Sequence, residues 1–474
     1  MKRSSNKSLV SRALRSALLL VASSGAMVVA SAAPGTAQTI EAALAKAYAA
    51  NPTLNAQRAA VRVINENVPQ ALSGYRPRIN ASGDLGLQLS DARTPGANGA
   101  VNALTSRTVP RGGALTIDQT IFNGGKTGNS VSQAESQVLG ARETLRNSEQ
   151  NVLLDAATSY MNVLRDTAIL NLNQNNGEVI EEQLRQVRDR FQVGEVTRTD
   201  VAQAEARLAQ ARSQQALAQS NLKTSIARYR QNVGVEPKKL APGKPVEKLL
   251  PKNINDALAH ALRGHPAVIA SMHGVDAAEL QVKVTEADLY PTLGVTGTLS
   301  KRYDFSTNND ERNTASAVAR LTIPIYEGGQ VYSRTRQAKE TASQRRIDVD
   351  TSRDTVRAAV VSAWGGLEAA KAQIVAAQAQ VQAAETALNG VREEAKVGQR
   401  TTLDVLNAQQ ELLTARSSLV TAQRDRVVAS YSTLSATGKL SARTLGLKVA
   451  EHDPSQHYKQ VRDLWWGTQV PDGR

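Results

Sequence analysis

Apolar residues recur at three- and four-residue steps through two long segments of the chain, residues 126–193 and 330–397. Neither segment contains proline, and residues that favour helices dominate both. A helical period that continues far beyond about 25 residues is typical of coiled-coil packing. The pattern therefore predicts two very long helices that pack against neighbouring helices along their length.

Shorter helical segments flank each long one. Residues 39–73 and 200–233 together match the length of 126–193, about 100 Å at 1.5 Å per residue. The same relation holds later in the chain for residues 253–287, 404–437 and 330–397. Two short helices stacked end to end would then stand beside each unbroken helix, and such elements could form the wall of a tall cylinder.

Four further stretches alternate apolar and polar residues with a period of two, as β-strands with one apolar face do. They are residues 79–90, 114–122, 293–300 and 317–325. Strands of about ten residues with this alternation are typical of a bilayer-spanning barrel, and a soluble antiparallel sheet is the alternative. The polar loops 90–113 and 301–314 lie between paired strands, so we expect them to face the cell exterior.

The chain contains an internal duplication. A shift of 214 residues relates the first short helix and its prolines to a later copy, and a shift of 204 relates the glycine-containing turns. We predict two structural repeats, residues 33–234 and 253–438. A linker at 235–252 joins them, and its prolines cannot continue a helix. Residues 439–474 form a C-terminal tail with two adjacent tryptophans.

Residues 1–32 have the features of a secretory signal peptide. A basic head precedes an apolar stretch from Ala17 to Ala30, and small residues provide a cleavage motif at Ala30-Ser31-Ala32. The apolar stretch is interrupted by serines and is shorter than the roughly 20 residues that a transmembrane helix needs. We therefore expect the mature chain to be exported without a helical anchor.

Composition and motifs exclude several classes of function. The chain has no cysteine, which excludes disulfides and a lipid-modified N-terminal cysteine. The net charge of +14 lies partly in the leader, and aromatic residues make up only 3%, so we expect no nucleic-acid partner. Gly125-Lys126-Thr127 lacks the earlier glycine of a phosphate-binding loop, and the histidines lack metal-site spacing. We predict no enzyme activity, cofactor or metal.

Four strands cannot close a barrel in a bilayer, because the two free edges of the sheet would keep unsatisfied backbone groups in lipid. Known barrels begin at about eight strands. A homotrimer would supply twelve strands, three times four, and as many helical wall elements. The predicted fold is therefore α plus transmembrane β: a trimeric twelve-stranded barrel, in contact with outer-membrane lipid, that continues into an α-helical barrel of coiled-coil hairpins.

The strand–helix junctions carry Phe122-Asn123-Gly124-Gly125 and Tyr326-Glu327-Gly328-Gly329. Both helical tips contain a Val-Gly pair with an aspartate six residues after the glycine. With these motifs and its duplicated plan, nearly all of the mature chain resembles the TolC family of trimeric outer-membrane export ducts. The resemblance implies an outer-membrane location with the helical tunnel in the periplasm. It also implies a periplasmic adaptor and an inner-membrane transporter of ABC or RND type as partners, with drugs or secreted polypeptides as cargo.

The resemblance further implies that both tips form the periplasmic end of the tunnel and close it at rest. The residues expected to contact the adaptor are Val193, Gly194, Thr197, Val397, Gly398 and Thr401. Asp404 would lie on the constriction ring, and Arg400 would bond towards Thr199 and Asp200 to hold the closed state. A simpler interpretation is that the tip glycines only end helices and the aspartates only begin them.

Two positions depart from the pattern of this family. Asn407 stands where a second acidic ring is expected, and Ala395 stands where a tyrosine that ties the closed state is expected. These differences predict a weaker constriction and a leakier resting state.

Two other functions fit parts of the pattern. A periplasmic adaptor also has long helical hairpins, but it should carry one hairpin inside lipoyl-like and barrel domains rather than a duplication of the whole chain. A passive porin has no use for helices of about 100 Å. The exit duct accounts for both the strands and the helices.

Overall fold

The computed structural model describes residues 37–95, 101–306 and 309–471, and the compact unit treated below begins at Gln38. The expected signal peptide, residues 1–32, lies outside the described residues. In the described part of the chain, no helix has both the length and the apolar character that a membrane crossing requires.

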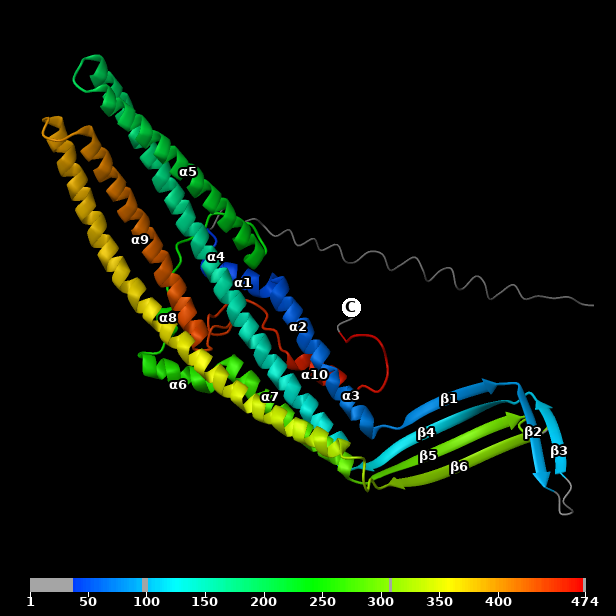
Figure 1. Cartoon of the computed structure of the whole chain (residues 1–474). Coiled ribbons are helices and arrows are strands. Elements are labelled where there is room, and N and C mark those ends of the chain that lie inside the picture. The colour runs from blue at the N-terminus through cyan, green and yellow to red at the C-terminus, as the bar shows by residue number, and fades with distance from the viewer. Residues whose placement is uncertain (1–36, 96–100, 307–308, 472–474) are drawn as a thin grey trace, which may run out of the picture. The chain divides into compact units, whose positions relative to one another are not determined.

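Two helices of 67 residues each dominate the structure, α4 (Lys126–Gln192) and α8 (Gln330–Lys396). Each turns back at its end into a shorter helix, α5 (Arg198–Val233) or α9 (Thr402–Ala436). The two hairpins lie side by side, with α4 packed along α9 (Figure 1). The bounds agree with the predicted segments to within two residues, so the long helices and their duplication are confirmed.

The short segments that precede the strands are not single helices, and this part of the prediction is wrong. Residues 39–73 form α1 (Ile40–Ala50), α2 (Pro52–Asn65) and α3 (Asn67–Leu72), followed by the 3₁₀ turn η1 (Ser73–Tyr75). Asn51 is extended because a proline follows it, and its side chain accepts the N–H of Thr53 at 2.9 Å to begin α2.

The second repeat is interrupted at the equivalent place, so residues 253–287 are not one helix either. Helix α6 (Ile254–Gly264) ends before His265, α7 (Pro266–Glu286) follows, and η3 (Ala287–Leu289) completes the segment. The Nδ1 atom of His265 accepts the N–H of Ala267 at 3.2 Å. A capping side chain followed by proline therefore produces the same break in both repeats.

Four long strands form one antiparallel sheet in the order β1-β4-β5-β6 (Figure 1). Their bounds are β1 Arg78–Leu85, β4 Arg111–Asn123, β5 Thr292–Tyr303 and β6 Glu311–Thr322. The register places the predicted apolar positions on one face, as in the row Ala81, Leu115, Leu299 and Ala315. The next row, on the other face, is Asn80, Thr116, Thr298 and Ser316. The amphipathic alternation is confirmed.

The structure corrects the predicted ends of these strands and both predicted loops. Residues 90–113 were expected to form a loop, but β2 (Gln88–Pro95) and β3 (Val101–Thr108) pair there as a separate hairpin. Leu87 lies between β1 and β2, because β1 ends at Leu85. Ile323 and Ile325 lie beyond the end of β6, and the expected loop 301–314 contributes to both β5 and β6.

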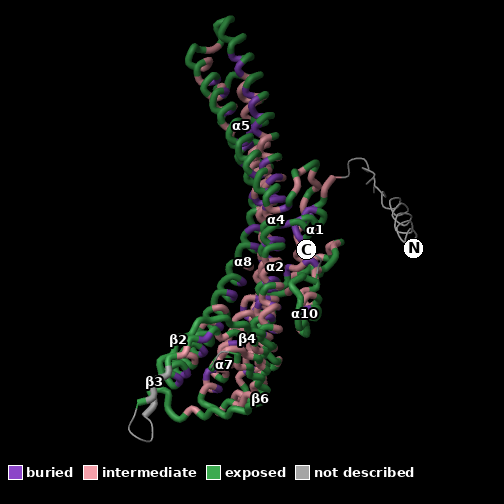
Figure 2. The backbone as a smooth tube through the Cα atoms, turned by 90° about the vertical axis from the view of Figure 1, so that its right-hand side faces the viewer, coloured by how far each residue is buried: buried purple, intermediate pink, exposed green. Residues whose placement is uncertain are grey.

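Buried residues concentrate in the helical part, whereas β1 and β6 are exposed throughout (Figure 2). The largest core cluster gathers around Tyr160, Tyr229 and Tyr431, where both repeats meet the linker and the tail. The hydroxyl of Tyr160 lies 2.7 Å from the carbonyl oxygen of Gln38 and 2.6 Å from that of Ala241. Burial raises the pKa of Tyr160 to about 12, so this hydroxyl keeps its proton and donates to the linker.

Replacing Tyr160 with phenylalanine should loosen the linker, because the Ala241 carbonyl loses its hydroxyl partner in a partly buried place. We expect the opening free energy of this region to fall by about 1–3 kcal/mol. Hydrogen exchange of the Ala241 amide, which donates to Gln38 at 3.0 Å, measures it. Tyr431→Phe is the control, since Tyr431 is buried in the same cluster, whereas the hydroxyl that donates to Gln38 and Ala241 is that of Tyr160. Equal effects of the two variants would contradict the assigned role of Tyr160.

Candidate functional site

The two helical tips have the same backbone conformation. Gly194 and Gly398 adopt left-handed conformations with φ of +82° and +80°, and a Cβ atom at either position would meet only open space. The need for glycine therefore comes from the backbone rather than from crowding. One residue later, the N–H of Glu195 bonds to the Arg190 carbonyl and that of Gln399 to the Glu394 carbonyl, both at 2.9 Å.

Each tip then starts its second helix with a reciprocal capping box. At the first tip, the N–H of Thr197 donates to Asp200 Oδ2 at 2.8 Å, and the N–H of Asp200 donates to Thr197 Oγ1 at 3.3 Å. Thr401 and Asp404 repeat these bonds at 3.0 and 3.2 Å. The interpretation of Asp200 and Asp404 as N-cap residues is wrong: Thr197 and Thr401 are the N-caps, and each aspartate is the third helical residue, which completes the capping box.

Asp404 is held in its ionised form. The backbone N–H of Thr401 lowers the pKa of its carboxyl, and the Thr401 hydroxyl and the positive charge of Arg400 act in the same direction. The pKa of Asp404 in the folded protein is below its ordinary value. The capping bonds of Asp404 therefore stabilise the fold fully when the pH is above that ordinary pKa. This stabilisation is lost only as the pH falls through the lowered pKa. The tip therefore carries a fixed negative charge at neutral pH.

Arg400 pairs within its own hairpin, with its Nε atom 2.8 Å from Glu394 Oε2. Both side chains remain about half exposed. Thr199 is exposed and Asp200 half-buried at the other tip. The expected bond would join Arg400 to Thr199 and Asp200 at the tip of a neighbouring hairpin, and it stays a prediction.

Asn407 has a partner that the sequence pattern did not reveal. Arg207 of α5 donates from Nη2 to Asn407 Oδ1 at 2.7 Å and so connects the two hairpins. Beside it, Leu406 is buried among Leu184 and Leu208 of the first hairpin. No local motif marks Arg207, because its role depends on how α5 and α9 approach one another. Asn407 therefore lies at a contact between the hairpins.

A groove of about 1000 Å³ runs between α4 and the α8–α9 hairpin near the tips. Ala395 and Arg400 line it together with charged residues such as Glu182, Arg190 and Arg392. Val193 and Val397 stand at the tips with 72% and 71% of their surfaces exposed. The tips thus combine two exposed apolar side chains with a charged groove.

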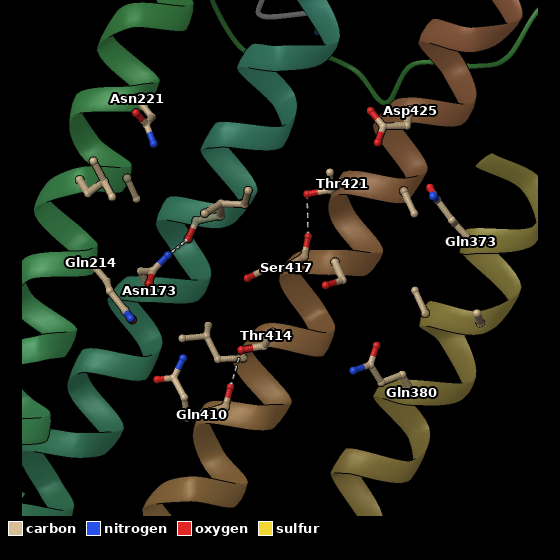
Figure 3. A pocket seen from close by; sticks show the side chains of 18 residues that line it. Asn173, Gln214, Asn221, Gln373, Gln380, Gln410, Thr414, Ser417, Thr421 and Asp425 are labelled. Carbon is tan, nitrogen blue, oxygen red and sulfur yellow. Dashed lines mark hydrogen bonds between the residues drawn. The ribbon is translucent and has the colours of Figure 1, made fainter. Parts of the chain in front are cut away.

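A second groove, of about 670 Å³, lies farther from the tips and is lined by all four long helices. Figure 3 shows neutral amide and hydroxyl side chains around it, including Asn173, Gln373 and Gln410. Thr421 donates to the Ser417 carbonyl at 2.9 Å, within its own helix. Among the residues that the structure describes, no group of three or more His, Cys, Asp or Glu side chains could hold a metal ion.

Comparison with known proteins agrees with this architecture. The family described as outer membrane efflux protein matches residues 43–235 and 257–439, one segment in each repeat. The outer membrane efflux protein BepC of Brucella suis is 44% identical over 438 residues, covering 92% of this chain and 93% of BepC. The outer membrane protein TolC of Escherichia coli is 26% identical over 84% of this chain and 82% of its own length.

The fold also matches a solved structure. The CmeC outer membrane channel of Campylobacter jejuni superimposes with a TM-score of 0.77 at 18% identity, covering 90% of this chain and 89% of CmeC. The matched family segments cover most of the two repeats, and the identity to BepC extends over nearly the whole chain. The chain therefore belongs to the outer membrane efflux protein family, the TolC-like channel proteins of the cell outer membrane.

Proposed function

We propose that this chain is the exit duct of a tripartite export system, which receives drugs or secreted polypeptides from a periplasmic adaptor and an inner-membrane pump of ABC or RND type. The observation that carries the proposal is the continuity of sheet and hairpins. Strand β4 leads into α4 through Gly124-Gly125, and β6 leads into α8 through residues 323–329. A sheet with one apolar face thus continues into helices of about 100 Å, long enough to cross much of the periplasm.

The duct would be a homotrimer closed through its sheets. Strands β1 and β6 are the two edges of the four-stranded sheet, and each needs a partner before it can enter lipid. Pairing β6 of one copy with β1 of the next closes three sheets into a twelve-stranded barrel. The β2–β3 hairpin, at the end of the sheet away from the helices, would then lie on the side of the membrane that faces the cell exterior. A periplasmic adaptor, the alternative, leaves the apolar face of the sheet without a role.

Arginine placed on the apolar face should prevent assembly. Leu115→Arg lies in the middle of that face and should cost about 2–4 kcal/mol near the bilayer midplane. Thr116→Arg, one residue along on the polar face, should be tolerated because it points into water. The measurements are outer-membrane fractionation and the yield of heat-modifiable trimers on gels. Equal insertion and trimer yield for the two variants would mean that the barrel or its orientation is wrong.

The tips would form both the gate and the adaptor contact. Three copies of Asp404 would face a narrow lumen, where carboxylates favour cations and repel one another. Arg400 would exchange its Glu394 partner for Asp200 and Thr199 of a neighbouring hairpin, and Asn407 would contribute a neutral ring beside this constriction. The adaptor would contact the exposed tip residues Val193, Gly194, Thr197, Val397, Gly398 and Thr401.

Removal of the Arg400 charge should open the gate. An exposed ion pair contributes only about 0.2–1 kcal/mol, but three pairs in a trimer would change a two-state gate several-fold. We expect Arg400→Ser to raise the single-channel conductance in planar bilayers. Glu394→Gln is the matched variant, since it frees Arg400 for the neighbouring hairpin and should not raise the conductance. An intact Arg400→Ser trimer with the conductance of the original protein would show that other contacts close the duct.

A further inference from the structure

The C-terminal tail is fixed against the end of the helical part that is nearest to the strands. Its short helix α10 (Ser455–Val461) packs on α2 (Figure 1). Val461 is fully buried, and Tyr458 packs on a cluster that includes Val68 and Val138. The Tyr458 hydroxyl donates to Glu135 at 3.1 Å. The residues after α10 therefore start from a defined place rather than from a loose end.

Beyond α10 the tail reaches the junction between helix and strand. Arg76, two residues before the first residue of β1, donates from Nη1 to the carbonyl oxygen of Leu464 at 2.5 Å. Its guanidinium group lies 4.8 Å from the centre of the Trp465 ring, within the range of a cation–π contact. Trp465 is nevertheless 63% exposed and Trp466 is 88% exposed. Two large aromatic side chains thus stand side by side in the chain without a covering surface.

Other exposed aromatic side chains occur at the same end of every long strand. They are Tyr75 before β1, Phe122 at the end of β4, Tyr290 before β5 and Tyr326 after β6, each at least half exposed. We define these four residues as the junction belt. Tyrosine and tryptophan are enriched where a membrane meets water, because the ring enters the apolar region while the polar edge stays hydrated. The junction belt therefore marks the level of the periplasmic membrane surface in the proposed barrel.

We propose that Trp465 and Trp466 extend the junction belt and anchor the tail in the periplasmic leaflet of the outer membrane. This inference rests on the proposed barrel, which sets the level of the bilayer. Phospholipid is the occupant that fits, since the indole rings would enter the head-group region and their N–H groups would donate to lipid oxygens. The Arg76 guanidinium, beside the rings, supplies a positive charge for the phosphates.

The three tryptophans of the chain make the proposal measurable by fluorescence. Trp364→Phe leaves only the tail pair, and Trp465→Phe combined with Trp466→Phe leaves only Trp364. Trp364 lies in α8, about 50 Å along the helix from Gln330, and so serves as a control outside the membrane. The protein is reconstituted as the full chain into vesicles of phosphatidylethanolamine and phosphatidylglycerol. The vesicles carry a nitroxide quencher either near the head group or near the end of the acyl chain.

We expect the tail pair to be quenched more strongly by the shallow nitroxide than by the deep one, and Trp364 to be quenched by neither. Arg76→Gln removes the cation–π contact that holds the tail at the junction. It should lower the ratio of chains with a docked tail to chains with a free tail about two- to fivefold, which corresponds to the free energy of an exposed cation–π contact. Arg58→Gln is a matched control, because Arg58 makes the same pair of contacts with Tyr48, at 4.6 Å from the ring and 3.0 Å from the carbonyl. It should leave the quenching unchanged.

The outcomes separate the anchor from the barrel. If heat-modifiable trimers bind the vesicles but their tail tryptophans are not quenched, the proposed membrane anchor is wrong and the proposed barrel is retained. A tail emission shifted to the blue without quenching would assign the pair to a protein contact, such as a neighbouring copy, and would also overturn the anchor. If the protein neither floats with the vesicles nor forms trimers, the proposed barrel is wrong, and so is the proposed anchor, which rests on it.

Discussion

A sheet with two free edges is incompatible with a bilayer, because lipid offers no hydrogen bonds to the exposed backbone groups. This constraint governs the rest of the structure. In the part of the chain that the structure describes, four long strands share an apolar face, so in the proposed barrel other copies would satisfy β1 and β6. Since the sheet continues into helices, closing the barrel would also decide which helical hairpins become neighbours. The proposed tunnel would in this sense follow from the pairing of the strand edges.

The duplication satisfies some of the strand edges within one chain, because a strand of the first repeat pairs with a strand of the second. Each repeat contributes two strands of the four-stranded sheet and one long helical hairpin. Strands β4 and β5 join the repeats through the same kind of pairing that would join neighbouring copies. The helical repeats are joined in a different way, by a linker that crosses the core. The Tyr160 hydroxyl and the backbone bond from Ala241 to Gln38 hold this linker in place.

Features with a long period could be predicted from the sequence, whereas features with local or three-dimensional causes could not. The 67-residue helices were predicted because their apolar spacing repeats many times. The breaks at Asn51 and His265 were missed, although a residue that can cap a helix followed by proline is a usable signal. Strands β2 and β3 were missed because they pair only with each other, outside the four-stranded sheet, and residues 90–113 were interpreted as a polar loop. The bond between Arg207 and Asn407 depends on the approach of two helices, which one sequence does not specify.

The tips are complete in themselves, since the glycine turn and the capping box satisfy their backbone groups without help from elsewhere. A tip of this kind resists fraying, so it moves as one piece with its hairpin. The end of α4 lies about 50 Å along the helix from Tyr160 in the core. At that reach, a tilt of about 5° displaces the tip by about 4 Å. In the proposed duct the long hairpins would therefore act as levers, and small changes in packing near the linker would become large displacements of the tips at the far end.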